Sequence, residues 1–139
     1  MDRAFELYSQ ANNLLLQISG PMSEEVATCI TQIASIQFKF GDFLQAIELQ
    51  TRAIVLLERL MGLDHPQVAY QYSTLAMYYH SCGYFQMSFA YMYRALNLLS
   101  MVAGDFHPEI ASIYLNLGLM YQEIEDQQAT IDSYSINLQ

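Results

Sequence analysis

A repeat with a period of 42 residues constrains the fold of this chain more than any other feature of its sequence. The stretch GLDHP at 62–66 returns 42 residues later as GDFHP at 104–108. The small residues Ala34 and Ala76 keep the same spacing, and no gap has to be inserted between the copies. A repeat of this length is one supersecondary unit, and such units stack into a solenoid. The sequence therefore predicts a stack of units that offers a binding surface rather than an active site.

The hydrophobic pattern within each copy predicts an all-α fold of about seven helices, paired as antiparallel hairpins. Apolar residues recur at the i, i+3 and i+4 spacing of a helix face, and no segment alternates as a strand would. Glycines at 41, 62, 83 and 104 suit the turns that end helices, and prolines at 66 and 108 suit a first helical position. The expected helices cover 3–18, 23–40, 43–61, 66–82, 85–103, 108–124 and 127–139.

The chain 1–139 is expected to be a single repeat domain with an incomplete unit at each end. Residues 1–19 would be the second helix of a truncated repeat, 23–61 and 66–103 two whole repeats, and 108–139 another truncated repeat. Repeat arrays need polar terminal caps. The end helices instead carry the apolar residues Leu14, Leu15, Ile131 and Tyr134, so we expect self-association through the exposed repeat ends.

Charge and composition disfavour several classes of function. The chain has 14 acidic residues against five basic ones, a formal net charge of −9. Such a surface repels phosphate backbones, so direct RNA binding by this segment is not expected. Cys29 and Cys82 lie far apart and favour neither a disulfide framework nor a zinc site, which suits a cytoplasmic setting. No signal sequence and no apolar run of roughly 18 residues is present, so membrane insertion is not expected.

The histidines invite a catalytic or metal-binding interpretation, which their surroundings oppose. His65 and His107 each precede a proline at a helix start, where a structural role in the turn is expected. His80 and Cys82 lie two residues apart, but a nucleophile pair would also need an orienting group and an oxyanion site. The spacing also differs from that of a zinc site. We therefore expect no enzyme activity, no metal and no cofactor.

Several residues of the second copy carry a resemblance to a known repeat. Tyr72, Leu75, Ala76, Tyr79, Gly83 and Ala95 fall at the spacings of a tetratricopeptide repeat. The 42-residue version with a G-x-D-H-P opening resembles kinesin light chains. The stretches AFELYSQANNLLL at 4–16, GLDHP at 62–66 and LAMYYH at 75–80 resemble the tetratricopeptide region of the clustered-mitochondria (Clu) family. The chain departs from the pattern at 22–24, where the other copies have His-Pro, and at Glu125, where Gly is expected.

The Clu resemblance implies the C-terminal repeat region of a large cytosolic protein needed for mitochondrial distribution. Such proteins are associated with messenger RNAs for mitochondrial proteins and, in fungi, with translation initiation factor 3. This resemblance implies a non-catalytic protein-interaction module whose partners are other domains of the parent protein and translation initiation factor 3. Two alternatives stay open: an mRNA-binding segment of the same protein, or a kinesin light chain-like module that binds cargo peptides.

Tetratricopeptide geometry implies that the first helices of the repeats line a concave groove. The residues expected to face it are Thr31, Ser35, Phe38, Tyr70, Ser73, Thr74, Met77, His80, Ser112, Asn116, Leu119 and Gln122. None of them is Lys or Arg, so capture of a terminal carboxylate is not expected. Hydroxyls, amides, Met and Tyr instead suit an extended or helical segment of a protein partner. The alternative is that the groove packs against the parent protein.

Overall fold

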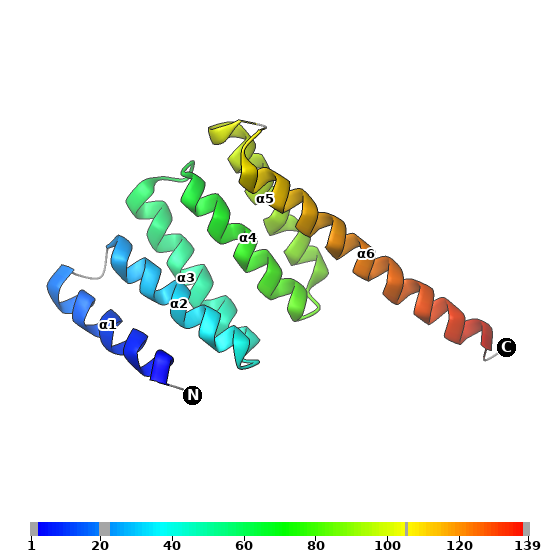
Figure 1. Cartoon of the computed structure of the whole chain (residues 1–139), viewed down its shortest axis with the longest axis horizontal. Coiled ribbons are helices and arrows are strands. Elements are labelled where there is room, and N and C mark those ends of the chain that lie inside the picture. The colour runs from blue at the N-terminus through cyan, green and yellow to red at the C-terminus, as the bar shows by residue number, and fades with distance from the viewer. Residues whose placement is uncertain (1–2, 20–22, 105, 138–139) are drawn as a thin grey trace.

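The computed structural model describes residues 3–19, 23–104 and 106–137, which form six α-helices and contain no strand. In chain order the helices are α1 (Arg3–Ser19), α2 (Glu24–Lys39), α3 (Phe43–Met61), α4 (Pro66–Ser81), α5 (Phe85–Ala103) and α6 (Pro108–Asn137) (Figure 1). The expected all-α solenoid is confirmed, and the first five helices begin and end within a residue or so of their expected bounds. Within the described ranges no helix has both the length and the apolar character needed to cross a bilayer.

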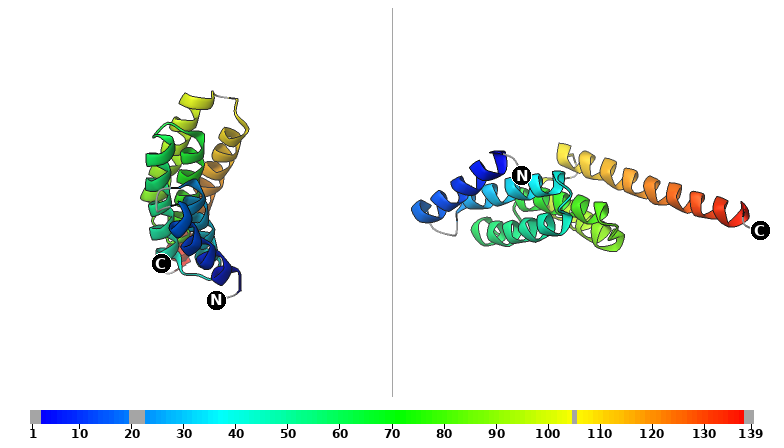
Figure 2. Two further views of the ribbon diagram at one scale, coloured as in Figure 1. Left: turned by 90° about the vertical axis from the view of Figure 1, so that its left-hand side faces the viewer. Right: turned by 90° about the horizontal axis from the view of Figure 1, so that it is seen from below.

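Two helical hairpins stacked side by side form the body of the molecule. α2 packs along α3 and α4 along α5, and α3 also packs on α4, which joins the two hairpins. α1 lies against α2 at one end, and α6 lies against α5 and α4 at the other. Figure 2 shows that the C-terminal half of α6 projects away from the hairpins. The copies of the 42-residue repeat are therefore neighbours in space, as a solenoid requires.

The small residues that recur with the repeat period lie where helices approach closely. Ala34, Ala53, Ala76 and Ala95 are all fully buried, and Leu75 fills the space beside Ala76 in the core. The third copy differs, because Gly118 and Tyr121 are exposed, although the neighbouring Leu117 is buried in the core. The reason is that, within the residues that the structure describes, no second helix of the third copy covers this part of α6.

The expected break at Glu125-Asp126-Gln127 is wrong, because α6 runs straight through it. The first two hairpins turn at Gly41 and Gly83, each with a φ of +85° that residues with a Cβ rarely adopt. Glu125 occupies the equivalent place in the third copy and has no such freedom. The chain therefore stays helical from Pro108 to Asn137, and the seventh helix expected at 127–139 is the second half of α6.

Caps at the helix starts explain the histidines of the repeat openings. His65 Nδ1 accepts a hydrogen bond from the Gln67 N–H at 3.1 Å, and His107 Nδ1 accepts one from the Glu109 N–H at 3.1 Å. Each ring thereby satisfies an amide that has no partner inside its helix. The expected structural role of both histidines is confirmed. Ser23 does the same for α2, because its Oγ accepts from the Val26 N–H at 3.2 Å.

We expect Gly83→Ala to lower the free energy of unfolding by about 1–2 kcal/mol, because alanine is strained in the left-handed conformation of this turn. Gly118→Ala is the matched control, since Gly118 is helical and has open space around it. That change should raise stability by roughly 0.5–1 kcal/mol. Urea unfolding followed by circular dichroism measures both. A similar loss in the two variants would contradict the assigned role of the turn.

Candidate binding groove

A hollow between α4 and α6 brings together residues from the second and third copies of the repeat. Its volume is about 320 Å³. The residues that line it are Tyr70, Ser73, Thr74 and Met77 of α4 and Glu109, Ser112, Ile113 and Asn116 of α6. Six of these eight were expected from the sequence to face a groove. The two walls come from segments about 40 residues apart in the chain, so the hollow exists only because the repeats stack.

The α4 wall combines an aromatic ring with hydroxyls that are already tied to the helix. Ser73 Oγ donates to the Tyr70 carbonyl at 2.7 Å, and Thr74 Oγ1 donates to the same oxygen at 3.4 Å. With their protons engaged, both hydroxyl oxygens remain acceptors toward the hollow. Tyr70 is half exposed, and Met77 adds a polarisable side chain that adapts to varied shapes. This wall can therefore accept N–H groups and contact apolar side chains.

The α6 wall supplies an amide and the one charged residue of the hollow. Asn116 is half-buried and can both donate and accept hydrogen bonds. Glu109 is the charged residue among the lining side chains, and no Lys or Arg lines this hollow. With a net charge of −9 on the chain, the local potential favours neutral or basic ligands over acidic ones.

The three residues expected on α2 do not line this hollow, and two of them, Ser35 and Phe38, pack against α4 instead. The Phe38 ring stacks on Tyr78 with 4.6 Å between centroids, and the Ser35 side chain is hydrogen-bonded to Tyr78. Burial raises the pKa of Tyr78, and the hydrogen bond from Ser35 opposes that shift. Thr31 is half-buried, and its Oγ1 donates to the Thr28 carbonyl at 2.7 Å. Ser35 and Phe38 thus hold the first two hairpins together.

His80 joins α4 to α6 near the far end of the hollow. Its Nε2 lies 2.6 Å from Glu123 Oε2, and its ring lies 5.1 Å from that of Phe85. The side chain is mostly buried, so it fixes the spacing of the two walls rather than facing a ligand. Leu119 and Gln122 lie further along α6, are exposed, and are not among the residues that line this hollow.

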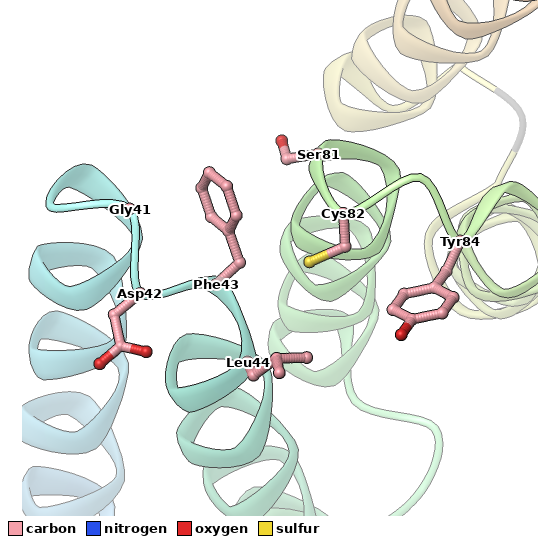
Figure 3. Close-up of a pocket in the computed structure, with 7 residues that line it drawn as sticks. All are labelled: Gly41, Asp42, Phe43, Leu44, Ser81, Cys82 and Tyr84. Carbon is pink, nitrogen blue, oxygen red and sulfur yellow. The ribbon is translucent and has the colours of Figure 1, made fainter.

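A second hollow of about 520 Å³ was not anticipated from the sequence. Figure 3 shows its lining at the tips of two neighbouring hairpins: Gly41, Asp42, Phe43, Leu44, Ser81, Cys82 and Tyr84. The equivalence of the turns at Gly41 and Gly83 is the sequence feature that could have located it. Burial raises the pKa of the Cys82 thiol, which disfavours the nucleophilic thiolate. Although larger, this hollow is built from turn tips, whereas the groove has two helix walls.

Metal binding finds no support in the part of the chain that the structure describes. No group of three His, Cys, Asp or Glu side chains there is arranged to hold an ion. His65 and His107 already use one ring nitrogen each to cap helices. Cys29 and Cys82 are both free thiols.

Comparisons with known proteins agree with the repeat architecture. One tetratricopeptide-repeat family model matches residues 26–67, and a second tetratricopeptide-repeat model matches residues 69–134. No curated protein sequence matches the chain. The crystal structure of BtubC (BKLC) from P. vanneervenii is similar, with a TM-score of 0.79 and 26 % sequence identity. The match covers 90 % of this chain and 50 % of that one, so the chain spans about half the length of this solved relative.

Proposed function

This chain is a tetratricopeptide-repeat solenoid, and from that premise we propose that it acts as a non-catalytic module that holds a segment of a partner protein between α4 and α6. Tetratricopeptide repeats are typically interaction modules that bind protein partners. The observation that carries the proposal is the hollow of about 320 Å³ whose two walls come from adjacent repeats. Residues far apart in the chain converge there without forming a catalytic or metal-binding group.

The lining chemistry supports a particular kind of partner segment. Acceptor hydroxyls at Ser73 and Thr74 and the amide of Asn116 suit backbone N–H and C=O groups of an extended or helical peptide. Tyr70 and Met77 suit an apolar anchor residue. Glu109 and the acidic surface favour a neutral or basic segment.

The parent protein and its setting are a finer part of the proposal. The stretches 4–16, 62–66 and 75–80 support a C-terminal repeat region of a Clu-like protein, which acts in the cytoplasm in mitochondrial distribution and in translation of mRNAs for mitochondrial proteins. Translation initiation factor 3 and other domains of the parent protein are then the partners to test first. The G-x-D-H-P opening supports the alternative of kinesin light chain-like cargo-peptide binding.

We select peptides that bind this chain from a random display library. Their affinity for the double variant Tyr70→Ala/Asn116→Ala should be at least about tenfold lower than for the unmodified chain. The reason is that one change removes an aromatic contact and the other an amide that pairs with a peptide backbone; together they are worth more than about 1.4 kcal/mol. Fluorescence anisotropy with the selected peptides measures the effect.

The matched control is Leu44→Ala/Tyr84→Ala, which alters the hollow at the hairpin tips and leaves the groove intact. Affinity that falls on this control and is retained on the groove variant would move the site to the tips. Tight RNA binding that weakens steeply with added salt would favour the mRNA-binding alternative instead.

A further inference from the structure

One face of α6 is open where the equivalent faces of the first two repeats are closed. Tyr114 is 60 % exposed, whereas its equivalents Tyr72 and Ile30, 42 and 84 residues earlier in the chain, are 6 % and 8 % exposed. The same holds one helical turn to either side: Ala111 and Gly118 are exposed, whereas Ala27, Ala69, Ala34 and Ala76 are fully buried. In the first two repeats the second helix of the hairpin, α3 or α5, covers this face. The third repeat therefore lacks its cover.

The second half of α6 carries the sequence pattern of the missing cover. Thr130 stands at the repeat position of Ala46 and Ser88, which are fully buried. Ile131 is 58 % exposed at the position where Ile47 is 8 % exposed. The two complementary faces cannot meet within one straight helix, because Gly118 and Thr130 are then separated by about 18 Å along its axis. α6 therefore carries both complementary faces of a hairpin, and within the described residues neither face covers the other.

The local backbone explains why α6 does not fold back on itself. The hairpins of the first two repeats turn at Gly41 and Gly83, in the left-handed region that favours glycine. A turn in the third repeat would place Glu125 in that conformation, which is strained for a residue with a Cβ. The straight helix avoids this strain and leaves its apolar faces open.

We propose that two copies of this chain complete their third repeats by exchange. Two α6 helices lie antiparallel, so that residues 127–137 of each copy cover the open face around Tyr114 and Gly118 of the other. In the second repeat Ser88 Oγ donates to the Ala76 carbonyl at 2.8 Å. The equivalent contact in the exchanged pair runs from Thr130 of one copy to the Gly118 carbonyl of the second copy. Exchange of an identical element is a low-cost route to a closed two-fold dimer.

The size and charge of the exposed faces bear on this pairing. Aromatic side chains bury roughly 150–250 Å² each. Tyr114 of the two copies therefore contributes on the order of 300–500 Å², and Ile131 with the smaller open residues has to supply the rest of the roughly 1,000 Å² that a specific interface needs. The antiparallel register also places Glu123 near Glu125 of the second copy, and these like charges repel. Added salt screens that repulsion, so the dimer is expected to tighten as the salt concentration rises.

A cysteine pair tests the exchange directly. Gly118→Cys and Thr130→Cys are introduced in a background of Cys29→Ser and Cys82→Ser, and the purified protein is oxidised and run on a non-reducing gel. We expect a covalent dimer, because the two positions meet only between copies. A disulfide within one chain would show that α6 folds back on itself. No disulfide, or a series of covalent oligomers larger than the dimer, would show that another surface covers this face. Each of these three results overturns the exchange.

A hinge glycine gives an independent readout. We expect the unmodified chain to be a dimer by light scattering over a micromolar concentration series, and Glu125→Gly to raise the dimer dissociation constant at least about 10-fold by allowing an intramolecular turn. Gln128→Gly is the matched control: it weakens helix formation equally but lies outside the turn. A monomeric parent chain, an unchanged Glu125→Gly variant, or an equal shift in both variants contradicts the exchange.

Discussion

Leu75→Ala is expected to lower the free energy of unfolding by about 2–5 kcal/mol, the largest single effect that the structure predicts. Leu75 is 1 % exposed on α4, the helix that packs against α3, α5 and α6. Truncating it removes buried apolar area and leaves a cavity that rigid neighbouring helices fill only in part. Because α4 joins the first hairpin to everything that follows, the loss should extend beyond the second repeat.

Urea unfolding followed by circular dichroism measures this loss, with Leu44→Ala as the matched control. Leu44 lies on α3 and is 68 % exposed, so the same chemical change there should alter stability by no more than about 0.5 kcal/mol. If the two variants unfold at similar urea concentrations, Leu75 does not lie in a packed core between repeats.

Gln50→Ala is expected to destabilise the chain by about 1–3 kcal/mol for each polar group that it leaves without a partner. Gln50 of α3 is fully buried, and its Nε2 donates to the Gln71 carbonyl at 3.1 Å and to Gln71 Oε1 at 2.7 Å. These bonds join α3 of the first hairpin to α4. Alanine would remove the donor and leave both Gln71 oxygens buried without it.

The control for this prediction is Gln67→Ala, at an exposed position at the start of α4. A double-mutant cycle with Gln71→Ala measures the coupling between the two glutamines. A coupling near zero would mean that the pair does not hold the repeats together, whatever the cost of each single change.

The repeat unit was predictable because its determinants are local. Glycines that permit left-handed turns, prolines at first helical positions and apolar spacing all act within a few residues of where they stand. The pairs Ala34/Ala76 and Ala53/Ala95 keep the 42-residue period because close helix approach demands small side chains. The straight course of α6 was harder to foresee, because it depends on the strain that a left-handed turn would impose on Glu125 and on long-range packing, and residues 127–133 are exposed. Leu15 and Tyr134, two of the residues expected to drive self-association, have side chains outside the described part of the structure.

The groove was only half predictable for a similar reason. Six of the twelve expected residues line the hollow between α4 and α6, because helical periodicity determines which residues share one face of a helix. Phe38 and His80 share that face, but each reaches a neighbouring helix, Phe38 at Tyr78 and His80 at Glu123. Side chains long enough to bridge two helices become packing residues, and a single sequence gives no measure of that distance.

Amide hydrogen exchange with and without a selected peptide tests most directly whether the stacked repeats bind their partner between α4 and α6. We expect protection to rise together in 70–77 and 109–116, two segments that meet only because the repeats are stacked. Protection that rises instead in 41–44 and 81–84, or in only one wall of the groove, would contradict it.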